Sequence, residues 1–338
     1  MTGPDATQRD PLALATEAGI HRLRLPTPFP VGPVNLYLVE DEPLTLIDTG
    51  PNSGTALDLL EQQLAVHGHE IEDLKLVVLT HQHMDHTGLL EIVARRSAAE
   101  VAAFAPLEGW LGDYRQSAAA EEEYAQSVLR RHGVPQDLVA LLGVVSAALH
   151  SYGSRGTVTR PLGDGDQLKL RDRTLHVAHR PGHSPSDLTF WDAERRLLIA
   201  GDHLLAHISS NPVIHRPLSG QTTGPRPTPL VDYVNALKAT QALPAQLVVG
   251  GHGEAVTDHV ELIDERLRLH ERRAAKILRM LHDEPLTAHE IAIQMWGSVA
   301  VTQAFLTLSE VLGHLDLLGV DGKVEEIDDG ELSRFAAV

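Results

Sequence analysis

The chain of 338 residues is long enough to bury a large core, and its composition is that of a globular protein, with 43% hydrophobic and 22% charged residues. The absence of cysteine excludes disulfides, thiolate metal ligands and a cysteine nucleophile. The formal net charge of -18 disfavours a nucleic-acid partner, because phosphate backbones are bound by basic surfaces. No apolar run approaches the roughly 20 residues of a membrane span, and no signal-peptide pattern opens the chain, so we expect a cytoplasmic protein.

The N-terminal third alternates strand and helix patterns. Residues 1–18 are polar without periodicity, which predicts a flexible tail. Apolar runs at 34–39 and 44–47, separated by Glu-Asp-Glu-Pro, predict a hairpin. Leucines at helical spacing then predict a helix over 55–67, and the apolar run 74–79 predicts a buried strand.

A dense group of metal-ligating residue types follows that strand, in the segment Thr-His-Gln-His-Met-Asp-His-Thr-Gly. Its four potential ligands are His81, His83, Asp85 and His86. A strand that ends in a tight loop aims alternate side chains at one point, so His81 and His83 can share one ion. Asp85 and His86, past the turn, can reach a second. Imidazole and carboxylate ligands suit zinc, manganese or iron.

The middle of the chain contains an insertion. Residues 105–160 are rich in Ala, Glu and Leu and predict two or three helices, with the run Glu121–Glu123 on a solvated face. Further strands are predicted at 167–170, 174–178, 188–191, 196–200 and 246–250. Five prolines make 211–229 an irregular loop, and a helix is predicted at about 230–241.

Three more potential ligands follow predicted strands. They are His183, Asp202 and His252, and each is flanked by glycine, which lets a backbone approach an ion closely. One such residue would be unremarkable in a chain with 20 histidines. Three at strand ends, all downstream of the first group, indicate a single site.

With these residues in this order, the chain resembles the metallo-β-lactamase superfamily over about residues 20–260. The matching positions are Asp48 in Ile-Asp-Thr-Gly, the His81–His86 motif, His183, Asp202 and His252. The resemblance implies an α+β fold, an αββα sandwich with two metal ions at one edge, so we assign 19–260 to a catalytic domain.

The resemblance also implies a role for each residue. One metal would be held by His81, His83 and His183, the second by Asp85, His86 and His252, with Asp202 bridging. Asp48 and His203 would support the ligands from behind. Two divalent ions, most simply Zn2+ with Fe or Mn as alternatives, turn a bridging water into a hydroxide nucleophile. Asp85 and Asp202 are therefore predicted to be catalytic.

This centre predicts hydrolysis of a small thioester, ester or lactone, the natural electrophiles for a carbonyl-polarising site. Zinc β-lactamases of the superfamily usually carry Cys or Ser at the position of Asp202, which disfavours antibiotic hydrolysis. No Arg/Lys set for glutathione is recognisable, and Leu205 stands where related lactonases often have Tyr. Loop and insertion residues are candidates to touch substrate: Trp110, Tyr114, Tyr152, His207 and Arg226.

Residues 261–338 predict helices followed by a short hairpin, similar to the winged-helix appendage of some superfamily members, among them an endoribonuclease of the β-lactamase-like 2 type. A metal-dependent ribonuclease or phosphodiesterase is therefore an alternative. This segment holds 8 Lys and Arg against 15 Asp and Glu, however, and nucleic-acid-binding modules are normally basic. We expect it to cover the site or to form a homodimer interface.

A further alternative is a di-iron oxidoreductase partner protein, since the same fold carries such centres.

The remaining histidines show no partner pattern and are interpreted as ordinary polar residues; they include His21, His67, His69, His215, His270 and His314.

Overall fold

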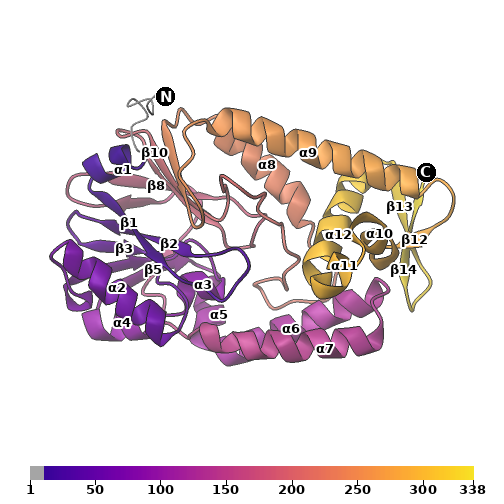
Figure 1. Ribbon diagram of the computed structural model, residues 1–338, viewed down its shortest axis with the longest axis horizontal. Coiled ribbons are helices and arrows are strands. Elements are labelled where there is room, and N and C mark those ends of the chain that lie inside the picture. Colours follow the sequence, from indigo (N-terminus) through magenta and orange to yellow (C-terminus); the bar gives the residue numbers. More distant parts are fainter. Residues whose placement is uncertain (1–10) are drawn as a thin grey trace, which may run out of the picture.

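Two β-sheets stacked face to face form the centre of the structure, a computed structural model that describes residues 11–338 (Figure 1). The first sheet has the order β1 (Ile20–Leu25), β2 (Val34–Val39), β3 (Thr45–Ile47), β4 (Leu76–Val78), β5 (Glu100–Phe104) and β6 (Arg160–Leu162). The second has the order β11 (Leu247–Gly250), β10 (Leu197–Gly201), β9 (Leu188–Asp192), β8 (Thr174–His179) and β7 (Gln167–Lys169).

Strand direction determines which loops meet. β3 runs parallel to β4, and β10 runs parallel to β11. Because carboxyl ends of parallel strands lie at the same edge of a sheet, the residues that follow β3 and β4 meet at one edge, as do those that follow β10 and β11. The loops that carry Asp48, His81, Asp202 and His252 all begin at these ends.

Alternation along the strands separates the buried layers. On β4, Leu76 and Val78 pack between the two sheets, where Phe190 of the second sheet meets them, while Val77 packs under the outer helices. Those helices are α2 (Gly54–Val66) and α4 (Leu90–Ser97), with the short η1 (Ile71–Asp73) and α3 (Met84–Thr87) in the connections. On the far side, α8 (Pro229–Gln241) and α9 (His259–Met280) cover the second sheet. The predicted αββα sandwich is confirmed.

The insertion and the C-terminal region form one helical unit beside the sandwich (Figure 1). The insertion comprises α5 (Leu107–Gly112), α6 (Tyr114–Arg131), α7 (Gln136–Leu149) and η2 (His150–Tyr152). The C-terminal region comprises β12 (Leu286–Thr287), α10 (Ala288–Trp296), α11 (Val299–Thr302), α12 (Ala304–Val320), β13 (Val324–Asp328) and β14 (Ser333–Ala337). Val128 and Leu129 of α6 share a hydrophobic core with Leu308 and Leu312 of α12.

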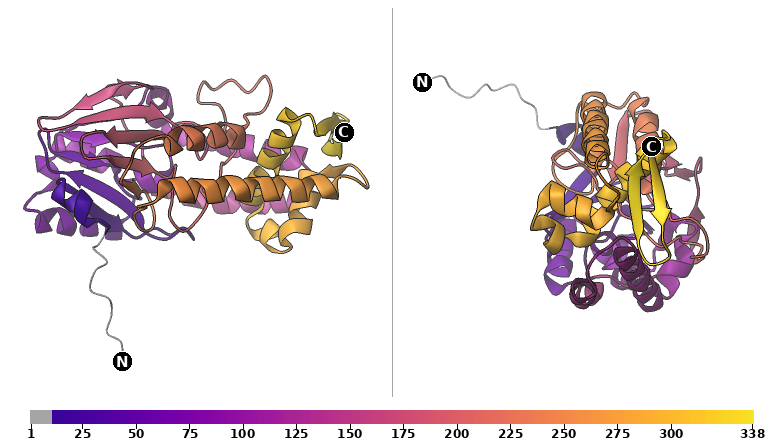
Figure 2. Two further views of the ribbon diagram at one scale, coloured as in Figure 1. Left: turned by 90° about the horizontal axis from the view of Figure 1, so that it is seen from above. Right: turned by 90° about the vertical axis from the view of Figure 1, so that its right-hand side faces the viewer.

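Helix α9 joins the two parts (Figure 2). Ile263, near its start, packs against the second sheet, whereas Ile277 lies in the core of the helical unit. The domain boundary predicted at residue 260 therefore falls at the beginning of a continuous helix. The predicted C-terminal helices and hairpin are present, and Thr287 and Glu290 form a capping box at the start of α10. The winged-helix assignment itself stays a prediction.

The predicted tail, residues 1–18, is wrong in its second half. Residues Ala13–Glu17 form the short helix α1, and Ala15 is buried between the sheets with Ile20. Residues 1–10 lie outside the described part of the chain. Within residues 11–338, no helix combines the length and the apolarity needed to cross a membrane.

Candidate metal centre

The structure brings all seven predicted ligands together at the edge of the sandwich where these strands end. Three overlapping groups have ligand atoms within 4.8 Å of one another: His81, His83 and His183; His81, His86 and Asp202; and Asp85, His86 and His252. Asp202 lies in the middle. One of its oxygens is 3.5 Å from His86 Nε2, and the other is 3.5 Å from both His183 Nε2 and His252 Nε2.

Hydrogen bonds on the outer side of the rings determine which nitrogen faces the centre. The outer nitrogen donates to a protein acceptor in three rings: His86 Nδ1 to Asp48 (2.8 Å), His252 Nδ1 to the Pro33 carbonyl (2.9 Å) and His183 Nδ1 to the Asn211 carbonyl (3.2 Å). An imidazole that donates from Nδ1 keeps a lone pair on Nε2 when it is neutral. The Nε2 atoms of these rings therefore face inward as acceptors, the form in which histidine binds metal.

Asp48 and Thr80 set the position of His81. Asp48 accepts hydrogen bonds from the Thr80 N–H and hydroxyl, both at 2.8 Å. Because the Thr80 hydroxyl donates to Asp48, it accepts from His81 Nδ1 at 2.9 Å, and His81 Nε2 is left facing the centre. The predicted supporting position of Asp48 agrees with this geometry, since one carboxylate holds both His86 and, through Thr80, His81.

His83 is supported by two residues that the sequence interpretation missed. Its Nε2 lies 3.1 Å from His215 Nε2, and His215 Nδ1 donates to Glu121 at 2.9 Å. His83 Nε2 therefore donates to His215, so that His83 Nδ1 faces the centre. Glu121 lies in α6 and His215 in the Pro-rich loop, so the expectation of a solvated glutamate run fails at Glu121. Only the fold brings these two elements together, and neither residue had a sequence signal.

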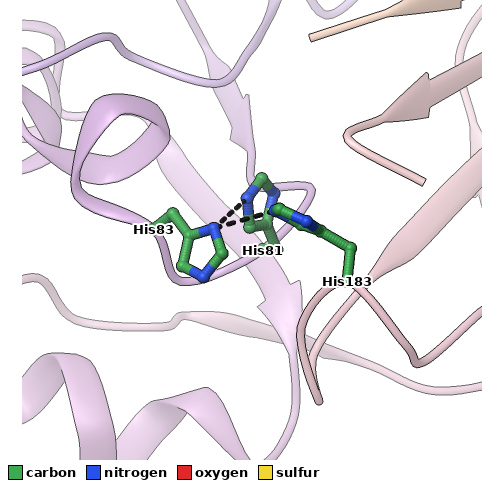
Figure 3. A group of neighbouring side chains, drawn as sticks. All are labelled: His81, His83 and His183. Atoms are coloured by element: carbon green, nitrogen blue, oxygen red, sulfur yellow. Dashed lines mark hydrogen bonds between the residues drawn. The ribbon is translucent and has the colours of Figure 1, made fainter. Parts of the chain in front are cut away.

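Three inward nitrogens meet at one point (Figure 3). His81 Nε2 and His183 Nε2 each lie 3.0 Å from His83 Nδ1. With their outer nitrogens already donating, these three atoms are mutually repelling lone pairs unless a cation lies between them. His86 Nε2, His252 Nε2 and Asp202 Oδ1 are buried without a hydrogen-bond partner. Buried polar atoms are normally satisfied, so this set fits divalent metal ions.

The electrostatics favour positive charge at the same place. Burial depresses the pKa of His81 and of His83 well below its usual range. Burial opposes the charged form of His86 too, but Asp202, Asp48 and Asp85 outweigh it and hold its pKa well above the usual range. Within residues 11–338, no Lys or Arg pairs with any of these three carboxylates.

Close packing at two glycines lets the strand ends converge. A Cβ on Gly251 would clash with Asp202 Oδ1 and lie 2.7 Å from His86 Cε1. Gly201 has a φ of +51°, and a Cβ there would meet Thr80 at 2.8 Å. Larger residues at these positions would push Asp202 and Thr80 out of the arrangement.

The cavity in front of the centre has a volume of about 460 Å³. Trp110 and Tyr114 line it, so these two of the five candidate substrate contacts lie where they were expected. Leu205 also lines the cavity. Tyr152 and His207 are not among its lining residues. Tyr152 packs edge-on against Phe29, and His207 is exposed beside Gly253.

Arg226 and His203 have other roles than the predicted ones. Arg226 forms two hydrogen bonds to Asp316 of α12, at 2.6 and 2.9 Å, because the Pro-rich loop folds against the helical unit. The His203 ring turns away from the ligands toward α8, where its Nε2 lies 2.8 Å from the Thr240 hydroxyl. His203 therefore supports the packing of α8 and not a metal ligand.

Comparison with known proteins identifies the family of this chain. The sequence pattern described as Metallo-beta-lactamase superfamily matches residues 29–252. The chain is 32% identical to "Probable metallo-hydrolase YqjP" of Bacillus subtilis, over 95% of this chain and 98% of that protein. It is 29% identical to "Acyl-coenzyme A thioesterase MBLAC2" of Bos taurus, over 50% of this chain and 57% of that one.

A solved structure shares the architecture. The metallo-beta-lactamase family protein TTHA1429 from Thermus thermophilus superposes with a TM-score of 0.77 at 27% identity, covering 95% of this chain and 99% of its own. The match thus includes the helical C-terminal region as well as the sandwich. With the family pattern spanning residues 29–252 and the YqjP relative spanning nearly the whole chain, the protein belongs to the metallo-β-lactamase superfamily of metal-dependent hydrolases.

Proposed function

We propose that the protein is a dinuclear hydrolase that cleaves the acyl bond of small thioesters, esters or lactones. The observation that carries this proposal is the cluster of inward-facing ligand atoms around Asp202, which opens into a cavity of about 460 Å³. Two divalent ions, most simply zinc, would supply an activated water and polarise the substrate carbonyl. His81, His83 and His183 would hold one ion, and Asp85, His86 and His252 the other, with Asp202 shared.

The chain's own contribution is to hold these ligands in one orientation. Asp48 fixes the His86 ring, and the Glu121–His215 pair fixes the His83 ring. Such outer hydrogen bonds select the ligating nitrogen before any ion binds, which reduces the cost of ordering the site. Asp85 and Asp202 supply the negative charge that two cations require.

The cavity wall favours an apolar acyl group. Its apolar lining side chains include Phe29, Val31, Trp110, Leu205, Ile208 and Leu306. None of the described residues that line it is Lys or Arg, which disfavours a polyanion at the metals. The bovine relative named as an acyl-coenzyme A thioesterase supports a thioester, the member of the proposed class that we favour.

The ribonuclease alternative has less support. Strand β13, in the hairpin that a winged-helix module would present to nucleic acid, exposes Glu325, Glu326 and Asp328. An acidic hairpin repels phosphate. We therefore place RNA second to a small acyl substrate.

A substrate panel tests the proposal. Metal-free protein, prepared with a chelator and then reloaded with Zn2+, is assayed on acyl thioesters of increasing chain length, on a lactone and on a single-stranded oligoribonucleotide. We expect metal-dependent turnover of thioesters that improves as the acyl chain fills the apolar cavity. Full turnover by the metal-free protein, or cleavage of RNA alone, would overturn the assignment.

A further inference from the structure

A second group of histidines lies at the opposite edge of the first sheet. His21 of β1, Glu40 directly after β2, and His67 and His69 directly after α2 meet there. β2 runs antiparallel to β3, so the residue after β2 lies at the edge away from Asp48, which follows β3. In Figure 1, β1 and α2 lie at the end of the molecule away from α10–α12. This group shares no residue with the metal centre.

Three imidazoles surround one carboxylate in this group. His21 Nε2 is 2.8 Å from one oxygen of Glu40, and His69 Nε2 is 3.6 Å from the other. The His67 ring packs on the His21 ring with centroids 4.2 Å apart. Ligand atoms of His21, Glu40 and His67 all lie within 4.8 Å of one another. These three side chains therefore form a compact set of nitrogen and oxygen ligand atoms, and His69 contacts the second oxygen of Glu40 from outside that set.

The backbone holds these side chains in place without a metal. Helix α2 ends in a Schellman motif, in which Gly68 N–H donates to the Ala65 carbonyl and His69 N–H to the Leu64 carbonyl, both at 3.0 Å. Gly68 adopts a φ of +79°, the left-handed conformation that this helix ending requires. The turn presents His67 and His69 on either side of the glycine. Glu40 N–H donates to the Gly19 carbonyl at 2.8 Å, which fixes the backbone of Glu40 opposite them.

No protein cation competes for this carboxylate. Among residues 11–338, Glu40 pairs with histidines and with no Lys or Arg. The adjacent Asp41, by contrast, is buried in an ion pair with Arg173 at 2.9 Å. The His21 and His67 side chains are half-buried, and Glu40 is 39% exposed, so the set is accessible from solvent.

We propose that His21, Glu40, His67 and His69 bind one divalent transition-metal ion, with zinc as the first choice, at a site independent of the catalytic centre. Three imidazoles around one carboxylate, two of them in the compact set and His69 beside it, match the ligand types and coordination number of zinc. The ion would cross-link the β1–β2 hairpin to the end of α2, two segments that are far apart in the sequence. It therefore adds stability and leaves the reaction unchanged.

Metal counting on the full chain tests this site. Chelated protein is loaded with Zn2+ at micromolar concentration, desalted and analysed for metal per chain. We expect the wild type to retain one more equivalent than the double variant His67→Ala, His69→Ala, and the control His282→Ala, an exposed histidine elsewhere, to match the wild type. With Co2+ as the probe, the visible absorption assigned to this site disappears in the double variant and persists in Asp202→Ala.

Stability and activity provide the second readout. Zn2+ should raise the Tm of Asp202→Ala further than that of the same protein carrying His67→Ala and His69→Ala, while the turnover of the wild type and of the surface double variant stays equal. Equal metal content in the wild type and the double variant would overturn the proposal. Binding that requires millimolar Zn2+ would also overturn it, because it indicates adventitious contact only.

Discussion

The metal centre and the helical unit both bury histidines together with carboxylates, and these two regions differ in what balances the charge. At the metal centre, Asp202 is surrounded by imidazole nitrogens and has an oxygen without a partner. In the helical unit, Glu310 is paired with Arg273, and Asp316 with Arg226. Carboxylates balanced by arginine have no need of an external cation.

The histidines differ in the same way. In the helical unit, His314 Nδ1 donates to the Glu310 carbonyl at 2.6 Å, and its Nε2 lies 3.2 Å from His270 Nδ1. These contacts form a chain of donors and acceptors that leaves one nitrogen, His270 Nε2, without a partner. At the metal centre several inward nitrogens converge on one space. The candidate metal centre thus differs from the helical unit in its converging acceptors and in having, among residues 11–338, no Lys or Arg paired with its carboxylates, and not in its histidine content.

Removal of the shared carboxylate should have the strongest consequence for activity. Asp202→Ala should abolish turnover and reduce bound metal at the centre. The Asp202 carboxylate lies 3.5 Å from three histidine ligands and is the ligand that both ions would share. Metal content and the hydrolysis rate of a thioester are measured together, with the circular dichroism spectrum as a check on folding. Turnover at the wild-type rate in this variant would show that the centre is not catalytic.

The next effect concerns the outer support of His83. Glu121→Gln weakens the hydrogen bond from His215 and therefore the bond by which His215 orients the ring of His83. We expect metal affinity to fall about 10- to 100-fold. Activity should fall at limiting Zn2+ and recover at high Zn2+. Glu123→Gln is the matched control, because Glu123 is exposed on the same helix. Equal metal affinity in both variants would contradict a positioning role.

A change in the helical unit should affect stability alone. Arg226→Met leaves Asp316 without its partner, and breaking such a buried pair costs about 3–5 kcal/mol. Burial already raises the pKa of Asp316 despite the nearby Arg226, so the unpaired carboxyl will take up a proton more readily. Urea unfolding should show the loss, with kcat/KM unchanged under native conditions. A loss of kcat/KM without a loss of stability would instead indicate that Arg226 contacts substrate.

The smallest effect is on acid stability. Burial, together with His314 and nearby arginines, lowers the pKa of His270 to about 3, against 6.5 in an unfolded chain. As pH falls through 6.5, the unfolded state binds a proton that the folded state does not bind. The contribution of His270 to the free energy of unfolding is therefore fully present above pH 6.5 and declines between pH 6.5 and 3. Each such group contributes a slope of up to about 1.4 kcal/mol per pH unit. His270→Gln should flatten the decline in metal-free protein, measured by urea unfolding between about pH 7 and 5.

Much of this architecture was predictable from local patterns. The strand at 34–39 was recognisable because buried strands carry apolar runs. The metal ligands were recognisable because they directly follow such strands in the sequence. Strand β5 was not recognised, since its core, Val101–Ala103, is mostly alanine, which does not favour strands. The N-terminal helix α1 was missed because five residues are too few for a periodic pattern.

The supporting residues of the site were beyond sequence reasoning. Glu121 and His215 are separated by 94 positions, and only the packing of α6 beside the Pro-rich loop brings them together. Arg226 is a candidate to touch substrate from its place in that same loop, yet its guanidinium faces Asp316. A ligand motif is local and readable from one strand end, whereas the contacts that orient it are long-range.

Restoring metal to a chelated protein while hydrolysis is followed shows whether two metal ions at this centre drive the reaction. The His67→Ala, His69→Ala variant is used, so that the surface cluster binds none of the added Zn2+. We predict no thioester turnover without metal, a rise to full rate as two equivalents of Zn2+ bind per chain, and no rise at all in Asp202→Ala. Full turnover before any Zn2+ is added, or metal binding without turnover of any acyl substrate, would contradict the proposed dinuclear hydrolase.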